Sequence, residues 1–228
     1  GPCAFIDAYD PARVFSSIDQ HGRYAFGNQP AIGQWNLARF AETLLPLLAD
    51  DQKTAISLAE DLLGAYVDYY QQYWLEGMGR KLGLSAATAD DRPLIDDWLA
   101  LLQQHEADFT NSFRALGADP ASLAELPEQP LQQQPDYFAW HQRWQARLAQ
   151  EPGGPGAARA LMQASNPQLV ARNHQLERAL QAAEQDDIKP CQRLLDHLRQ
   201  PFSSQPGMAD LCRPAGPGDW TGRTFCGT

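Results

Sequence analysis

Residues 93–116, PLIDDWLALLQQHEADFTNSFRAL, decide the fold class of this 228-residue chain. Their apolar side chains recur every three or four positions, which is the spacing of one face of an α-helix. Asp91 precedes the stretch, Pro93 opens it and Gly117 follows it, and these are residue types that start and stop helices. We therefore predict one helix from Pro93 to Leu116.

Two helices are predicted before this stretch. Apolar residues at helical spacing over 32–45 predict an amphipathic helix that ends at Pro46. A longer helix is expected to begin at Asp50 or Asp51, where the side chain can accept a backbone N–H, and to run to Lys81. Basic residues in its last turn suit the negative end of the helix dipole.

Helical spacing returns downstream in three segments, residues 135–150, 173–184 and 188–199. Residues 151–156, EPGGPG, predict a flexible loop between the first two of these. Residues 1–30 and 201–228 are rich in Pro and Gly and lack helical periodicity. No alternating run of β-branched residues predicts a strand, so we expect an all-α fold with a helical body over 31–200.

Composition excludes several classes of protein. With 43% hydrophobic residues the chain can bury a large core, and no apolar run approaches the roughly 20 residues of a membrane span. The net charge of −10 argues against binding to nucleic acid, whose phosphates require a basic surface. Four cysteines are too few for a disulfide scaffold and favour a reducing, cytosolic setting. The expected localisation is a cytoplasm of bacterial type.

The start of the chain carries a group of motifs, namely GPCAFIDAYDP at 1–11, VFSSID at 14–19, GRYAFGNQP at 22–30 and QWNLARF at 34–40. This run resembles the selenoprotein O family, kinase-like proteins that transfer AMP onto other proteins. Further matches continue along the chain, at KLGL (81–84), FTNSFRAL (109–116), NP (166–167), RNH (172–174) and TFCGT (224–228). The resemblance covers nearly the whole sequence.

The resemblance implies a fold and a role for the first thirty residues. The body would be the helical C-lobe of a protein-kinase-like fold, followed by an irregular tail over 201–228. Residues 10–30 would correspond to the activation segment, which in kinases orders the site and presents the protein substrate. The residues assigned to it are Asp10, Arg23, Tyr24, Asn28 and Gln29. Arg23 is expected to fix this loop to the helical lobe rather than to contact nucleotide.

The catalytic residues are expected upstream of this chain. In the family, the Gly-Pro pair follows an Asp-Tyr of the metal-binding motif, and here the sequence begins at Gly1. We therefore expect no catalytic, cofactor-binding or metal-binding residue in this chain, and no cofactor bound by it alone. The resemblance implies ATP with Mg²⁺ or Mn²⁺ in the full-length protein. Asp7, Asp10 and Asp19 are expected to form turns, and His174 to help cap the helix after it.

Two cysteines are redox candidates by resemblance. In some members a cysteine near the C-terminus pairs with one in the activation loop. Here Phe15 occupies the matching loop position, which leaves Cys3 and Cys226 as the candidates. Two alternatives stay open, a disulfide between Cys3 and Cys226 and a free thiol at Cys226.

The predicted function is that of the C-terminal part of a protein nucleotidyltransferase, which would transfer AMP from ATP to Ser, Thr or Tyr hydroxyls. Its partners would be protein substrates and its own N-terminal lobe, with neither nucleic acid nor membrane. The alternative is a stand-alone all-α interaction module without nucleotide chemistry. A conventional kinase or pseudokinase is a third option. The sequence before Gly1 separates the first two, and the mass added to a substrate separates AMP from phosphate.

Overall fold

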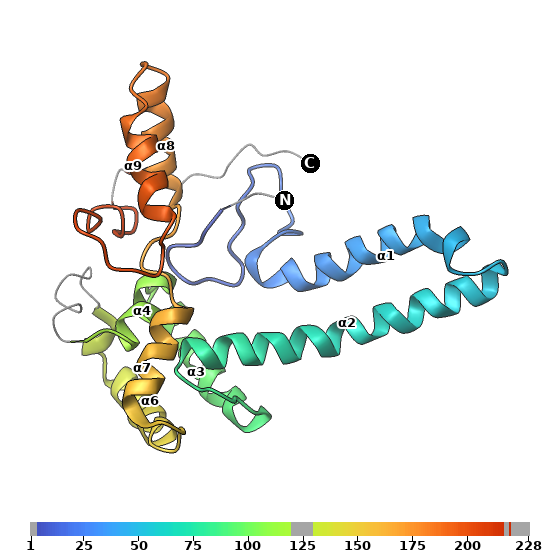
Figure 1. The fold of residues 1–228 in the computed structure, drawn as a ribbon, viewed down its shortest axis with the longest axis horizontal. Coiled ribbons are helices and arrows are strands. Elements are labelled where there is room, and N and C mark those ends of the chain that lie inside the picture. The colour runs from blue at the N-terminus through green and yellow to red at the C-terminus, as the bar shows by residue number, and fades with distance from the viewer. Residues whose placement is uncertain (1–3, 120–129, 217–218, 220–228) are drawn as a thin grey trace. The chain divides into compact units, whose positions relative to one another are not determined.

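The structure is a computed structural model that describes residues 4–119, 130–216 and 219. Contacts divide the described chain into two compact units, residues 11–75 and residues 4–10 with 76–216 and 219. Helices form the regular structure of both, and the described residues contain no β-strand beyond one isolated bridge between Ala8 and Asp108. The predicted all-α class is confirmed (Figure 1). The separate segments 1–30, 31–200 and 201–228 stay a prediction.

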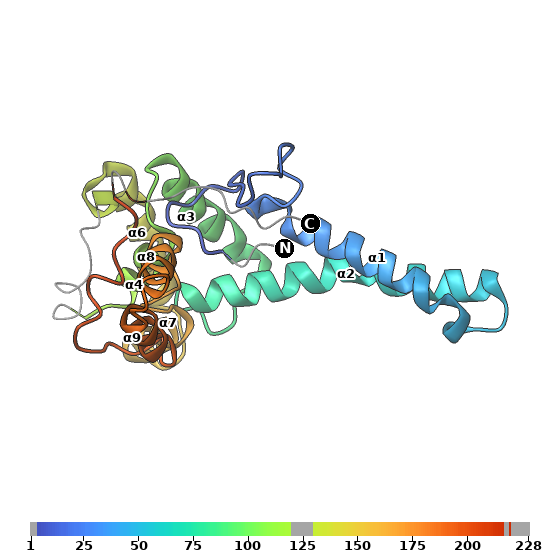
Figure 2. The same cartoon turned by 90° about the horizontal axis from the view of Figure 1, so that it is seen from above.

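The first unit is a helical hairpin that follows a short 3-10 helix, η1 (Phe26–Asn28). Helix α1 (Gln29–Leu48) and helix α2 (Gln52–Lys81), whose residues up to 75 belong to this unit, run side by side (Figures 1 and 2). Tyr66 Oη donates to the carbonyl oxygen of Pro30 at 3.1 Å and joins the two helices. None of the helices among the described residues is both long enough and apolar enough to cross a bilayer.

The ends of these two helices test the predicted boundaries. Asp51 Oδ2 accepts the N–H of Thr54 at 2.8 Å, so the predicted start of α2 at this aspartate is confirmed. Helix α1 does not end at Pro46, as predicted, but continues to Leu48. A proline removes one backbone hydrogen bond from a helix, and here that loss falls in the last turn, where little helix remains to be disrupted.

The second unit has a core of tryptophan rings and contains the remaining helices of the described residues. They are η2 (Ala89–Asp91), α3 (Arg92–Gln104), α4 (Phe109–Leu116), η3 (Pro130–Gln133), α6 (Pro135–Leu148), α7 (Gly154–Ser165), α8 (Asn173–Ala183) and α9 (Lys189–Leu198). The rings of Trp98 and Trp140 stack at 4.4 Å between centroids, and Trp144 stacks on Trp140 at 5.6 Å. The indole N–H of Trp140 donates to the carbonyl of Leu94 at 2.9 Å, which satisfies this buried donor.

The single helix predicted over 93–116 is wrong, because the chain breaks between α3 and α4. Glu106 has a φ of 48°, in the left-handed region that a continuing helix does not use. Asp108 then starts α4, and its side chain accepts the N–H of Asn111 at 2.7 Å. The periodicity of the apolar residues continues through the break because both helices face the same core.

A second correction concerns residues 151–156, where a flexible loop was predicted. Helix α7 begins inside this segment at Gly154, directly after Gly153, which has a φ of 84°. Helices α8 and α9 agree closely with the predicted segments and form a hairpin (Figure 1). A small core holds this hairpin, made by Leu169, Leu194, Met208, Leu211 and Cys212.

Candidate functional site

Residues 19–29 of the predicted activation segment lie in the first unit, and their side chains form hydrogen bonds with the backbone of the same segment. Asp19 accepts the backbone N–H of Arg23 and of Tyr24, each at 2.8 Å, so its predicted role as a turn former is confirmed. Asn28 Nδ2 donates to the carbonyl of Gly22 at 2.7 Å, and Gln29 Nε2 donates to that of Tyr24 at 2.6 Å. The side chains of Asp19, Asn28 and Gln29, three in all, thus organise residues 19–29, which include the short helix η1.

Arg23 links this segment to helix α1. Its guanidinium carbon lies 4.5 Å from the ring centroid of Trp35, a distance typical of a cation–π contact. Asp10, the first residue assigned to the activation segment, belongs to the second unit. That these residues together act as an activation segment stays a prediction.

A buried arginine of the second unit binds two carboxylates from distant parts of the sequence. Arg172 is 1% exposed. Its Nη1 pairs with Asp7 Oδ1 and, at 2.7 Å, with Asp108 Oδ2, while Nη2 donates to Asp108 Oδ1 at 3.0 Å. We call Asp7, Asp108 and Arg172 the Arg172 junction. It joins the N-terminal segment, the start of α4 and the residue preceding α8.

Backbone contacts reinforce the same connection. The N–H of Tyr9 donates to the carbonyl of Ala107 at 3.0 Å, and that of Phe109 donates to the carbonyl of Asp7 at 2.8 Å. These bonds surround the bridge between Ala8 and Asp108, and the rings of Tyr9 and Phe109 stack at 5.6 Å. Residues 7–9 are therefore held against the start of α4 by backbone, ring and charge together.

The electrostatics of the Arg172 junction favour the ion pairs. Burial disfavours the charged form of Arg172, but the hydrogen bonds and charges of Asp108 and Asp7 outweigh burial and raise its pKa. Arginine suits this position because its planar group can bind both carboxylates at once. The nearby Asn111 Nδ2 donates to the carbonyl of Cys212 at 3.1 Å, so the same region of α4 also binds the segment after α9.

Two predictions about this region need correction. Asp7, expected to form a turn, instead pairs with Arg172. His174 does not cap α8, because Arg172 occupies the N-cap position and His174 lies inside the first turn, 3% exposed. Burial lowers the pKa of His174 and favours its neutral form. Two features of the sequence could have predicted the junction. They are Asp108, an aspartate at the N-cap of a helix, and Arg172, an arginine directly before a helix.

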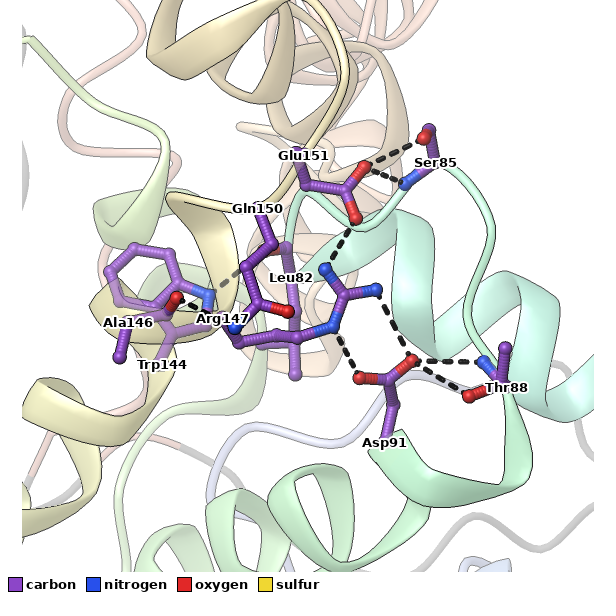
Figure 3. A network of polar contacts seen from close by, with 9 residues as sticks. All are labelled: Leu82, Ser85, Thr88, Asp91, Trp144, Ala146, Arg147, Gln150 and Glu151. Atoms are coloured by element: carbon purple, nitrogen blue, oxygen red, sulfur yellow. Dashed lines mark hydrogen bonds and ion pairs between the residues drawn. The ribbon is translucent and has the colours of Figure 1, made fainter.

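A second arginine network lies elsewhere in this unit and is shown in Figure 3. Arg147 Nε donates to Asp91 Oδ1 at 2.6 Å, and its Nη1 donates to Glu151 Oε1 at 2.7 Å. Glu151 Oε2 also accepts the N–H of Ser85 at 2.8 Å, and Asp91 Oδ2 accepts the N–H of Thr88 at 2.9 Å. We call Asp91, Arg147 and Glu151 the Arg147 network.

These contacts keep both carboxylates of the Arg147 network ionised. Burial opposes ionisation of Asp91 and Glu151, but the hydrogen bonds from Arg147, Thr88 and Ser85 outweigh burial and lower both pKa values. The network fastens the segment between α2 and α3 to the end of α6. Its described hydrogen bonds stay among Ser85, Thr88, Asp91, Arg147 and Glu151, so we interpret it as structural support.

The remaining predictions concern metal binding and the cysteines. Within the described residues, no three or more His, Cys, Asp or Glu side chains gather where they could hold a metal ion. Cys3 and Cys226 lie outside the described residues, so their pairing stays a prediction. Burial raises the pKa of Cys212 to about 11, which makes its thiol unreactive.

Comparison with known proteins assigns the chain to a class and then to a family. It is 49% identical to the protein nucleotidyltransferase YdiU of Halalkalibacterium halodurans, 47% to that of Syntrophotalea carbinolica and 46% to that of Alkaliphilus metalliredigens. Each match covers the whole chain. The family model described as protein adenylyltransferase SelO matches residues 1–199. The chain belongs to the SelO family, and the resemblance seen in the sequence is confirmed.

The matches also bear on length. The chain spans about half of the curated relatives, since it covers 46% of each of the three. The activity of these relatives therefore comes to this chain as a proposal.

Proposed function

We propose that this chain is the C-terminal part of a protein adenylyltransferase, which transfers AMP from ATP to a Ser, Thr or Tyr hydroxyl of another protein. The observation that carries the proposal is the identity of 46–49% along the whole chain to proteins named protein nucleotidyltransferase. The intact enzyme would use ATP with Mg²⁺ or Mn²⁺. It would act in the cytoplasm on protein partners.

In the proposed reaction the substrate hydroxyl oxygen forms a bond to the α-phosphorus of ATP. The bond from that phosphorus to the oxygen bridging the α- and β-phosphates breaks, and pyrophosphate leaves with its electron pair. The hydroxyl proton passes to a base or to solvent. Such transfers depend mainly on alignment of the reacting groups and on stabilisation of phosphate charge.

The described residues would contribute alignment rather than chemistry. The side chains over 19–29 organise the segment expected to face the protein substrate, and Arg23 stacks on Trp35 of α1. The second unit would be the helical lobe on which the nucleotide site rests. The kinase-like character of that lobe is part of the proposal.

The test compares the chain alone with a chimera that carries the N-terminal half of the Halalkalibacterium halodurans relative before Gly1. Each is incubated with a generic acceptor protein and ATP labelled on the α-phosphate, and the product is weighed by mass spectrometry. We expect the chimera to add AMP and the chain alone to add nothing above a heat-inactivated control. Addition of phosphate would favour a kinase, and an inactive chimera would favour the interaction module.

A further inference from the structure

The Arg172 junction holds a segment whose position matters if the proposed function is correct. Residues 7–9 come a few positions after Gly1, and the proposed function implies a metal-binding motif of the nucleotide site before Gly1. They contain no helix or strand that would fix them internally. Their described contacts run to the start of α4, to Arg172 and, from Asp7 Oδ2 at 3.5 Å, to the N–H of Ala215.

We infer that Arg172 is a positioning residue, which holds the segment after the nucleotide site in register with the helical lobe by binding Asp7 and Asp108 together. The inference rests on the proposed function. Arg172 would touch neither ATP nor the substrate hydroxyl. It acts through Asp7, which is 165 residues away along the chain.

Burial and geometry distinguish this role from a surface ion pair. Arg172 is almost fully buried, and Asp108 already has a structural duty as N-cap of α4, with its side chain bonded to Asn111. The position of Asp108 is therefore set by the helix. Arg172 transfers that fixed position to Asp7, whose side chain is 28% exposed and has no helix of its own.

The consequence for catalysis follows from alignment. A displacement of about 1 Å at the reacting groups can reduce a rate about 100-fold, even when its origin lies far from the chemistry. Loss of the junction should therefore lower kcat and leave KM for ATP nearly unchanged if the nucleotide still binds to the rest of its site. A purely stabilising arginine would lower the folded fraction and leave kcat per folded molecule unchanged.

The experiment uses the active chimera with Arg172→Met, and Arg147→Met as its matched control. Both variants remove an arginine that binds two carboxylates in the same unit. Rates are measured below the melting temperature of both variants and divided by the folded fraction from circular dichroism. We expect kcat to fall about 100-fold in R172M and to stay within about twofold of the parent in R147M.

Two further variants make the test independent of folding failure. Asp7→Asn keeps the shape of the side chain but removes its charge, and should lower kcat in the same direction with little change in melting temperature. Arg172→Lys keeps the charge but cannot bind the two carboxylates as a planar fork, so its kcat should lie between those of R172M and the parent.

Hydrogen exchange on the chain alone provides a readout without activity. The amides of Tyr9 and Phe109, which donate across the bridge, should exchange faster in R172M and D7N than in the parent, and at the parental rate in R147M. Equal exchange in all variants, or equal kcat per folded molecule in R172M and R147M, would overturn the inference. An inactive parental chimera would refute the proposed function, and hydrogen exchange would still test the junction.

Discussion

Two arginines of the second unit use the same chemistry for different purposes. Each binds two carboxylates, but the partners of Arg172 lie 165 and 64 residues away in sequence, whereas those of Arg147 lie 56 and 4 residues away. The Arg172 side chain is 1% exposed and that of Arg147 is 23% exposed. The Arg147 network fastens a loop to the end of a helix, while the Arg172 junction holds a segment that has no regular structure.

The difference shows what determines the importance of an ion pair. A buried charge loses its hydration, and its partners must compensate for that loss. At Arg147 solvent can replace part of a lost partner, and Asp91 and Glu151 keep hydrogen bonds from Thr88 and Ser85. Solvent has almost no access to Arg172, so its two carboxylates must compensate for the hydration that the guanidinium group loses.

The largest effect is expected for Arg172→Met, which would leave Asp108, whose side chain is 10% exposed, without its cation. We expect the free energy of unfolding to fall by about 4 kcal/mol, as for other buried pairs that lose one member. Urea unfolding followed by circular dichroism measures the change. A loss below about 1 kcal/mol, the size typical of an exposed pair, would show that the junction is not buried in solution.

A smaller loss is expected for Arg147→Met. Its carboxylates keep their backbone donors, so we expect the free energy of unfolding to fall by about 2 kcal/mol. The same urea experiment applies, and the double variant R147M/R172M should show additive losses because the two sites share no partner. A loss as large as that of R172M would contradict the distinction drawn between the two sites.

The Arg147 network should also make stability depend on acid pH. The pKa values of Asp91 and Glu151 are lowered in the folded state, so between these values and the ordinary ones the unfolded state binds more protons. The stabilisation is complete above about pH 5 and is lost as the pH falls through the lowered pKa values. The stability difference between the parent and R147M should therefore shrink on acidification. A difference that stays constant down to about pH 3 would contradict this linkage.

The smallest effect concerns another cation of the second unit, the half-buried Lys81, which sharpens the comparison. Its Nζ donates to the carbonyl of Ser165 at 3.3 Å and to Asn166 Oδ1 at 3.2 Å, and no carboxylate of the described residues forms an ion pair with it. Burial therefore lowers the pKa of Lys81 to about 8 from 10.5. We expect Lys81→Met to raise the free energy of unfolding at neutral pH by about 1 kcal/mol, because a charge buried at a cost is removed.

The pH dependence gives the sharper measurement for Lys81. Below its folded pKa both states carry the charge and the folded state bears the cost of burial. As the pH rises from about 8 towards 10.5, the folded state releases its proton first and parental stability should increase. This increase should be absent in K81M and unchanged in the exposed control Lys53→Met. An increase that persists in K81M would assign it to another group.

Local patterns predicted most of the helices. The start of α2 at Asp51 and the bounds of α8 and α9 follow from capping residues and apolar spacing, which act within a few residues. The break between α3 and α4 was missed because both helices place apolar residues on one core. Helix α7 was missed because the glycines before it predict a loop, and the segment needs its partners in the core to form a helix.

The sequence by itself determined the family, the all-α class and the turn built on Asp19, because motifs and short-range hydrogen bonds are readable along the chain. Only the tertiary structure decided the partners of Arg172, since Asp7 and Asp108 reach it from positions that no local pattern connects. The physical reason is burial. Arg172 loses its water only when three distant segments meet, and only then do its two carboxylates become necessary.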